Sequence, residues 1–160
     1  MQQPVIKTTP VIKLVGKRIA TSLAQNRTGE LWRSFMPHRK LISRTVDSSL
    51  YSVQLYGDGY FNSYNPAAEF EKWAAVQVTG FENLPDGMEA LTIPAGLYAV
   101  FIHKGPAADG PKTFQYIFTQ WLPQSGYVVD NRPHFEVMGE KYKADSPDSE
   151  EELWVPVKAR

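Results

Sequence analysis

Hydrophobic and polar residues alternate in several short segments of the chain, with the period of two that is typical of β-strands. The clearest examples are residues 132–138 and 150–157. In the first segment Phe135 and Val137 share one face, so Glu136 belongs to the other. We therefore predict a strand in each segment, and we expect Glu136 to point away from the main apolar face.

The second of these strands contributes an aromatic side chain. Leucine or valine occupies positions 153, 155 and 157, which leaves Glu152 and Trp154 on the opposite face. We place Glu136 and Met138 beside these two residues. A carboxylate next to a methionine and a tryptophan forms an aromatic wall that carries a negative charge, and such a wall suits an organic cation.

Two other segments have the spacing of amphipathic helices. Residues 30–41 carry apolar side chains at helical intervals, and Pro37 breaks or kinks this helix. Residues 113–122 repeat the pattern and end at Pro123. Residues 1–10 are interpreted as an N-terminal lead-in. The remaining strands are predicted at 11–22, 50–56, 70–79 and 88–103, the last as a strand pair or one long bent strand.

The chain contains an internal repeat, with halves at about 11–80 and 88–158. The helical motif LWxxFMP at 31–37 matches IFxxWLP at 117–123. Each half reads strand, helix, strand, strand. We therefore predict an α+β fold with a single domain at 11–160: a duplicated unit forms one curved antiparallel sheet, with both helices on one face and a ligand cleft on the other.

A pseudo-two-fold axis between the halves would relate their aromatic residues. Trp73 and Trp154 are equivalent in the repeat, so we expect them to face each other across the cleft, with Glu71 mirroring Glu152. The counterpart of Glu136 is a serine. The repeat thus predicts a shared aromatic frame with a single central acid.

Composition and charge exclude several classes of function. The 160 residues are enough for one domain with a proper core. Seventeen basic and seventeen acidic residues give a net charge of zero, which does not indicate binding to nucleic acid. The absence of cysteine excludes disulfides and thiolate zinc sites. The three histidines lack metal-ligand spacing, so we expect neither a metal nor a cofactor.

The chain has no run of about 18 apolar residues, and its first residues lack the pattern of a signal peptide. We therefore expect a cytoplasmic protein that does not contact a membrane. The sequence leaves open whether it is a monomer or a homodimer.

Four motifs follow one another in the second half of the chain: GLYAVFxHKG at 96–105, WLPxSGY at 121–127, PxFE at 133–136 and ELWVPV at 152–157. In this order and spacing they resemble the GyrI-like (gyrase-inhibitor-like) domain family. The same domain is the effector-binding domain of AraC-type and MerR-type regulators that respond to drugs. The resemblance covers nearly the whole chain, from about residue 11 to residue 157.

The resemblance implies a function and a set of residues. Members of this family bind hydrophobic cations in a sheet cleft, with a buried glutamate and surrounding aromatic residues. Some members hydrolyse cyclopropane-bearing toxins, and one type binds gyrase. By position Glu136 fits the pocket glutamate, while Glu152 and Trp154 fit the acid and aromatic pair of the last strand, where tyrosine is commoner. The chain has no room for the helix-turn-helix of the regulators, so the resemblance implies a stand-alone binding module.

The ligand-binding site that we expect combines two acids with apolar and aromatic side chains: Glu136, Glu152, Trp73, Trp154, Met138, Tyr56 and Tyr98. Burial would raise the pKa of Glu136 in the empty site, and a bound cation would lower it. The main hypothesis is the capture of a hydrophobic or aromatic organic cation.

Three alternatives remain open. Glu136 could be a solvated strand carboxylate with no ligand. It could instead serve, like Glu152, to activate water in a hydrolase that opens a strained cyclopropane. Finally, the acidic loop at 145–152 could bind a partner protein such as gyrase.

Overall fold

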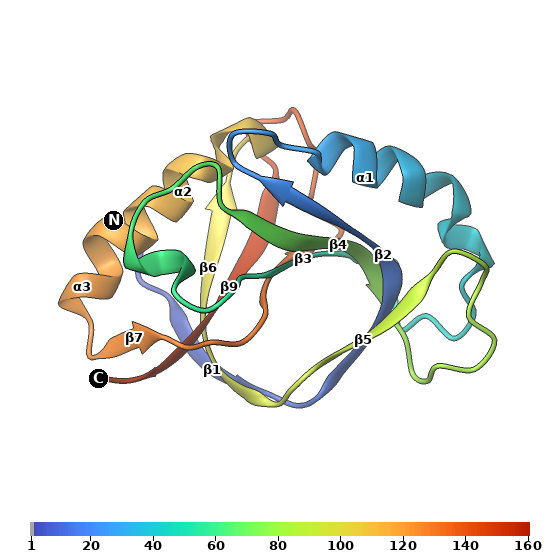
Figure 1. Cartoon of the computed structure of the whole chain (residues 1–160), viewed down its shortest axis with the longest axis horizontal. Helices are drawn as coiled ribbons and strands as arrows, with labels where there is room; N and C mark the ends of the chain where they lie inside the picture. The colour runs from blue at the N-terminus through green and yellow to red at the C-terminus, as the bar shows by residue number, and fades with distance from the viewer. Residues whose placement is uncertain (1) are drawn as a thin grey trace.

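The computed structural model of the chain describes residues 2–160. Helical segments lie on one side of a large sheet (Figure 1). The strands are β1 (Val5–Thr9), β2 (Ile12–Ser22), β3 (Leu50–Leu55), β4 (Glu69–Gln77), β5 (Glu89–Ile93), β6 (Gly96–Lys104), β7 (Tyr127–Val129), β8 (His134–Met138) and β9 (Glu150–Ala159). The helical segments are α1 (Thr28–Phe35), η1 (Met36–Leu41), η2 (Tyr60–Asn62), η3 (Ala107–Asp109), α2 (Gly110–Tyr116), η4 (Ile117–Trp121) and α3 (Leu122–Gln124).

The strands form one antiparallel sheet in the order β1-β6-β9-β8-β3-β4-β2-β5, and β7 pairs with the end of β9. The first half of the repeat supplies β2, α1, β3 and β4, and the second half supplies β6, α2, β8 and β9. The predicted α+β fold, with strand, helix, strand and strand in each half, is confirmed. Within residues 2–160 there is no helix of the length and apolar character that a membrane span requires.

Two long bent strands bridge the two edges of this sheet. The chain bends at Pro10 between β1 and β2, and at Pro94 between β5 and β6. Proline has no backbone N–H to donate to the hydrogen-bond ladder of a sheet, so the strands are interrupted there. The pairing of β1 with β6 continues in the same register as the pairing of β2 with β5. Residues 5–16 and 89–100 thus form a two-stranded arch, seen at the bottom of Figure 1. Residues 5–9, which we expected to be a lead-in, are strand β1 of this arch.

Gly16 marks the point where β2 passes from the arch into the sheet. It is paired with Glu89 of β5 on one side and with Ala75 of β4 on the other. A Cβ atom at this position would lie 2.0 Å from the carbonyl oxygen of Ala74. Glycine is therefore needed here because the backbone of β4 approaches so closely.

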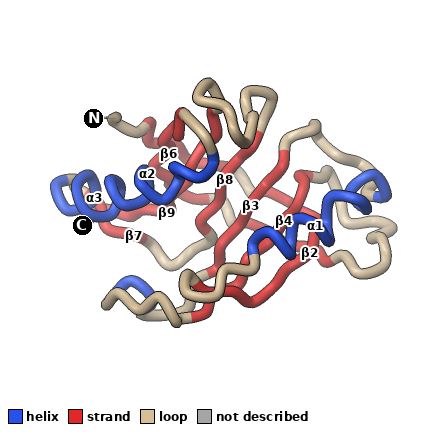
Figure 2. The backbone as a smooth tube through the Cα atoms, turned by 90° about the horizontal axis from the view of Figure 1, so that it is seen from above, coloured by secondary structure: helices blue, strands red, loops and turns tan. Residues whose placement is uncertain are grey.

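Both helices lie on the same face of the sheet, as predicted. Leu31 and Phe35 of α1 pack in a buried cluster with residues of β2 and β4, and Ile117 after α2 packs on residues of β6 and β9. Pro37 lies in the first turn of η1, so the α-helix ends at Phe35 and the chain continues as a 3₁₀-helix. The central strands β3 and β8 run between the two helices (Figure 2).

The strand register assigns each side chain to one of the two faces, because directly paired residues share a face. We call the side with the helices the helix face and the opposite side the arch face. One row on the helix face consists of Lys17, Ala74, Ser52, Glu136, Leu153 and Phe101. The neighbouring row on the arch face consists of Arg18, Trp73, Val53, Phe135, Trp154 and Val100.

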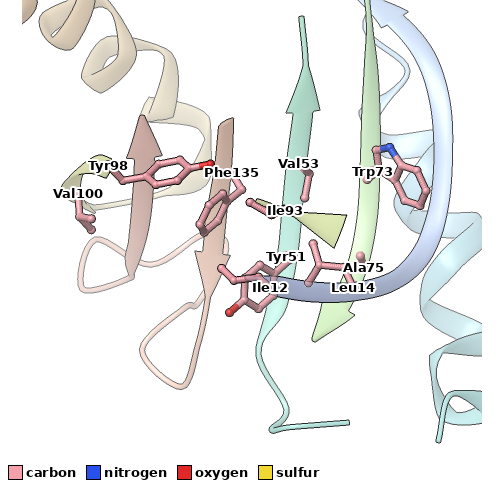
Figure 3. Close-up of a cluster of buried hydrophobic side chains, with 10 residues drawn as sticks. All are labelled: Ile12, Leu14, Tyr51, Val53, Trp73, Ala75, Ile93, Tyr98, Val100 and Phe135. Atoms are coloured by element: carbon pink, nitrogen blue, oxygen red, sulfur yellow. The ribbon is translucent and has the colours of Figure 1, made fainter. Parts of the chain in front are cut away.

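A hydrophobic cluster fills the arch face. Its buried members come from the arch and from strands β3, β4 and β8 (Figure 3): Ile12, Leu14, Tyr51, Val53, Trp73, Ala75, Ile93, Tyr98, Val100 and Phe135. The sheet is therefore covered on both sides, by the helices on one and by the arch on the other. Core side chains occupy the face where we expected the ligand cleft.

The two halves of the repeat meet at the centre of the sheet. Ser52 of β3 pairs directly with Glu136 of β8. On either side of this pair, Tyr51 pairs with Val137 and Val53 pairs with Phe135. Ser52 and Glu136 are also equivalent in the repeat. The pseudo-two-fold axis therefore passes between them, and one half places a hydroxyl where the other places a carboxyl group.

Candidate functional site

Glu136 lies on the helix face and is only partly exposed. The polar side chains around it come from four strands: Gln54 of β3, Lys72 of β4, His103 of β6 and Glu151 of β9. Polar residues of a strand ordinarily face water, whereas these converge on the centre of the protein. Glu136 is thus part of a polar cluster inside the fold rather than a solvated strand residue.

Glu136 and Glu151 form a pair of carboxyl groups. Glu136 of β8 pairs with Leu153 of β9. Glu151 lies two residues before Leu153 and on the same face, so the carboxyl groups of Glu136 and Glu151 are within hydrogen-bonding reach of each other. Burial raises the pKa of Glu136, while the charges of Lys72 and His103 act against this rise. Burial, followed by the charge of Glu136, raises the pKa of Glu151 to about 7. The expected rise in the pKa of Glu136 is confirmed, but a second acid that we had interpreted as solvated shares the site.

Lys72 supplies one positive charge for these two acids. Burial lowers its pKa, whereas the charges of Glu136 and Glu151 raise it. Gln54 is 3% exposed and donates from Nε2 to the hydroxyl of Ser52 at 3.2 Å. Its Oε1 atom is buried and has no hydrogen-bond partner among residues 2–160. The cluster therefore contains two acids, two basic side chains and one unused acceptor.

His103 joins this cluster to α2. Its Nδ1 atom lies 2.7 Å from the hydroxyl of Thr113, and its Nε2 atom lies 2.9 Å from the carbonyl oxygen of Pro106. A carbonyl oxygen only accepts, so Nε2 carries a proton. The ring is 4% exposed and holds the beginning of α2 close to β6.

Aromatic rings lie beside the carboxyl pair on the same face. We call them the aromatic cover: Tyr56, Tyr60, Phe61, Phe70, Phe118 and His134. Tyr56 is at its centre, with four ring centroids of the cover at 4.5 to 4.9 Å. Burial raises the pKa of Tyr56, and the charges of Tyr60 and Glu136 add to this rise. The charge of Glu136 therefore acts on the ring at the centre of the aromatic cover.

The loop at 56–68 joins β3 to β4 and reaches from β4 towards α2 (Figure 1). Phe61 stacks on Phe118 with 5.1 Å between centroids and 10° between ring planes, and its centroid lies 5.4 Å from that of His134. It is still 42% exposed. Burial lowers the pKa of His134 to about 3, so this ring is neutral and acts as an aromatic surface.

A surface hollow of about 490 Å³ adjoins the aromatic cover. Its lining includes Leu55, Gly57 and Phe70 together with the ion pair of Arg18 and Glu71. The ring of Phe70 is also 4.9 Å from that of Tyr56. Phe70 is therefore a wall shared by the hollow and the cover.

The structure brings together three of the residues that we expected in the site. Glu136 and Met138 lie on the helix face of β8. Tyr56, which directly follows β3, lies near Glu136, but at the opposite end of the strand pair from Met138. Both Met138 and Tyr56 are partly exposed.

Four expected residues lie instead on the arch face: Trp73, Tyr98, Glu152 and Trp154. The indole N–H of Trp154 donates to Glu152 at 3.0 Å, and that of Trp73 donates to Glu71 at 3.2 Å. The mirror relation of these two pairs is as the repeat predicts. Our placement of the tryptophans beside Glu136 is corrected, because Phe135 pairs directly with Trp154 and Glu136 with Leu153.

The residues that we missed carry a weak signal in the sequence. Lys72 is two residues from Ala74 on β4 and Gln54 is two residues from Ser52 on β3, so parity alone assigns each of them to the helix face of its strand. Glu151 belongs to a run of three glutamates, which is typical of solvated charge. The rings of Phe61 and Phe118 come from a loop and a helix, whose contacts with β8 no strand pattern predicts.

Replacing Glu151 by glutamine should change how stability depends on pH. An acid with a raised pKa holds more protons in the folded than in the unfolded chain between pH 4.5 and about 7, so it lowers stability as the pH rises through this window. We expect the Glu151→Gln protein to gain about 1–3 kcal/mol over the unmodified protein between about pH 5 and 8 in urea unfolding.

The comparison of the two proteins is needed because His134 has the opposite effect. Its pKa is lowered from 6.5 to about 3, so the stability that it contributes is lost as the pH falls through that range. The His134 contribution is the same in both proteins and cancels in the difference. Parallel stability curves would contradict a raised pKa at Glu151.

Residues 5–157 match the protein family described as Cass2, integron-associated effector binding protein. The transcriptional regulator BrlR of Pseudomonas aeruginosa is 28% identical over 149 residues, which are 92% of this chain and 53% of BrlR. A DNA gyrase inhibitor of Erwinia billingiae is 37% identical over 99 residues, which are 58% of this chain and 61% of the inhibitor. The chain thus spans about half of the regulator and three fifths of the inhibitor.

The fold is also that of solved structures. The structure of SAV2435 bound to tetraphenylphosphonium matches with a TM-score of 0.75 and 15% sequence identity, over 98% of this chain and 94% of that chain. The fold and the family match both extend over nearly the whole chain, and the resemblance to GyrI-like domains is confirmed. The chain therefore belongs to the Cass2 family of integron-associated effector binding proteins.

Proposed function

We propose that this chain binds hydrophobic organic cations at Glu136, on the helix face between α1 and α2. The observation that carries the proposal is the setting of this carboxyl group. It is partly exposed, it lies beside the aromatic cover, and a second acid, Glu151, lies within hydrogen-bonding reach of it. An entering cation would meet negative charge on one side and ring faces on the other.

Charge and apolar burial together are sufficient for recognition. A contact between a cation and an aromatic ring contributes about 0.5–2 kcal/mol, depending on desolvation. Burial of the ligand's apolar surface adds roughly 25 cal/mol per Å², and a partly buried carboxylate attracts a cation more strongly than one in water. None of these contributions requires one ligand shape, so we expect micromolar affinity and broad selectivity.

A ligand that stacks on the rings beside Glu136 would displace Phe61 and the loop at 56–68. Gly59 has a φ of +76°, and a Cβ atom at Gly57 would meet nothing within 4 Å, so the first residues of the loop are open and adaptable. Phe61 is already 42% exposed. Its departure would uncover the faces of Phe118 and His134, and an aromatic ring of the ligand would take its place in the stack.

The comparisons support the proposal. The family description names effector binding, and SAV2435, which shares the fold, was solved with tetraphenylphosphonium, a lipophilic cation. The charge and shape of that ligand fit a site made of one carboxyl pair and several aromatic rings.

Calorimetric titration with tetraphenylphosphonium and with tetraphenylborate tests the proposal. The two ions have nearly the same shape and opposite charge, so apolar burial alone would favour both. We expect micromolar binding of the cation at pH 7.5, and at least about tenfold weaker binding of the anion. Equal affinities for the two ions, or no binding of the cation, would refute cation recognition.

The similarity to a DNA gyrase inhibitor favours a second candidate function, the binding of a gyrase-like partner protein. The loop before β9 presents Asp145 and Asp148 to solvent, whereas Glu151, at the start of β9, is buried. A supercoiling assay with gyrase tests this candidate, and unchanged supercoiling at a large excess of the protein would exclude it.

A further inference from the structure

The carboxyl pair at the centre of the helix face has an unbalanced charge. Glu136 and Glu151 approach each other from adjacent strands, and Lys72 on β4 is the lysine that faces both of them. One ammonium group can balance one carboxylate. His103 adds positive charge near Glu136, but its two ring nitrogens contact Thr113 and Pro106 instead of a carboxyl group. The second carboxyl group is therefore left to pair with a proton or with a cation from outside the protein.

Other titratable groups face the pair from every neighbouring element. They are Tyr56 at the end of β3, Lys72 on β4, His103 on β6, His134 on β8 and Tyr142 in the loop before β9. His134 is neutral above about pH 3, and burial raises the pKa of both tyrosines, so these three groups carry no charge at neutral pH. The Nε2 proton of His103 is held by the carbonyl oxygen of Pro106.

We propose that the site takes up an organic cation in exchange for a proton: in the empty protein Glu136 and Glu151 share one proton, and a bound monocation releases it to solvent. This inference rests on the proposed function and adds the ionic state of the site. The exchange is balanced, because a carboxylic acid becomes a carboxylate, the cation supplies the positive charge that replaces the proton, and the proton goes to the buffer.

The pair is suited to this exchange by its geometry. Two carboxyl groups within hydrogen-bonding reach and largely shielded from water repel each other when both are ionised, so they titrate as a unit. The raised pKa of each carboxyl group agrees with a proton held at neutral pH. Gln54, whose Oε1 is unpaired among the described residues, offers an acceptor to the protonated form.

A proton exchange predicts how affinity depends on pH. Where the pair holds its proton, release of one proton per bound cation should lower the Kd for tetraphenylphosphonium about tenfold for each unit of rising pH. Above the apparent pKa of the pair the Kd should become constant. The sign is fixed, because a low pH supplies the competing ion.

Calorimetry of the whole chain with tetraphenylphosphonium measures the exchange directly. Titrations at pH 6.5 in buffers of different ionisation enthalpy should show close to one proton released per ligand, and titrations from pH 5.5 to 8.5 should show the slope and the plateau. In the Glu151→Gln protein Lys72 balances Glu136 alone, so binding should be weaker, release no proton and vary little with pH. The Glu152→Gln protein is the matched control, since residue 152 lies on the arch face, and it should behave like the unmodified protein.

A second measurement needs no ligand. Carbon-13 NMR of the glutamate carboxyl groups should show the shared proton of the empty protein leaving near neutral pH, and Glu151→Gln should remove that transition. Binding without proton release, the same pH slope in Glu151→Gln, or two carboxyl groups that both ionise below about pH 5 would each overturn the exchange while leaving cation binding intact. A protein that binds no tetraphenylphosphonium at any pH would overturn both proposals.

Discussion

Replacing Phe135 by alanine should lower the free energy of unfolding by about 3–5 kcal/mol. Phe135 is 1% exposed and lies in the middle of the arch-face cluster (Figure 3). Its ring centroid is 5.1 Å from that of Trp154, 5.2 Å from that of Tyr98 and 5.9 Å from that of Tyr51. These three rings belong to three different strands, so alanine would leave a cavity that no single neighbour can fill.

Urea unfolding followed by tryptophan fluorescence measures this loss, because Trp73 and Trp154 lie in or against the same cluster. Phe61→Ala is the matched control: the same side chain is removed from an exposed loop, and the loss should stay below about 1.5 kcal/mol. A Phe135→Ala protein within about 1 kcal/mol of the unmodified protein would show that the arch face is not the tightly packed core described above.

Replacing Glu136 by glutamine should weaken the binding of tetraphenylphosphonium by about 30-fold to 1,000-fold at pH 7.5. Glutamine keeps the size of the side chain and its hydrogen-bonding atoms but removes the charge that attracts the cation. The fold should not suffer, because burial raises the pKa of Glu136 and its ionised form is therefore unfavourable in the empty protein. Loss of affinity with unchanged or higher stability is the expected combination.

The same calorimetric titration, together with a thermal melt, measures both effects. Glu152→Gln is again the control, since its side chain accepts from the indole of Trp154 on the arch face and should leave the affinity unchanged. Full affinity in Glu136→Gln would place the bound cation elsewhere, and the surface hollow beside Arg18 and Glu71 would be the next region to examine.

The sequence was sufficient to predict the fold because two signals agree. The repeat pairs the motif before Pro37 with that before Pro123, and the strands between have clear alternation, so the order of elements could be read directly. Strand β1 could not be predicted in the same way. Residues 5–9 pair with β6, about 90 residues away, and four of the five side chains are exposed, so they have no apolar pattern of their own.

The site was predicted only in part. The alternation along one strand separates its two faces, but it does not tell which face lies on the same side of the sheet as a given face of the neighbouring strand. Phe135 with Val137, and Leu153 with Val155, each read as an apolar face. They lie on opposite sides of the sheet, since one pair meets the arch and the other meets α2. Because both sides of the sheet are buried, the apolar residues of a single strand could belong to either side. Only the register of pairing with the neighbouring strands decides between the two.

The arch also has a consequence for the evolution of this fold and for the behaviour of fragments of the chain. Because β1 pairs with β6 and β5 pairs with β2, each half of the repeat lends a strand to the other half. A chain cut in the connector between β4 and β5 would yield two fragments that each carry an orphan edge strand, and mixing them should restore one intact molecule. By the same geometry, an ancestor with a single half could complete its sheet only as a homodimer that exchanges its first strand.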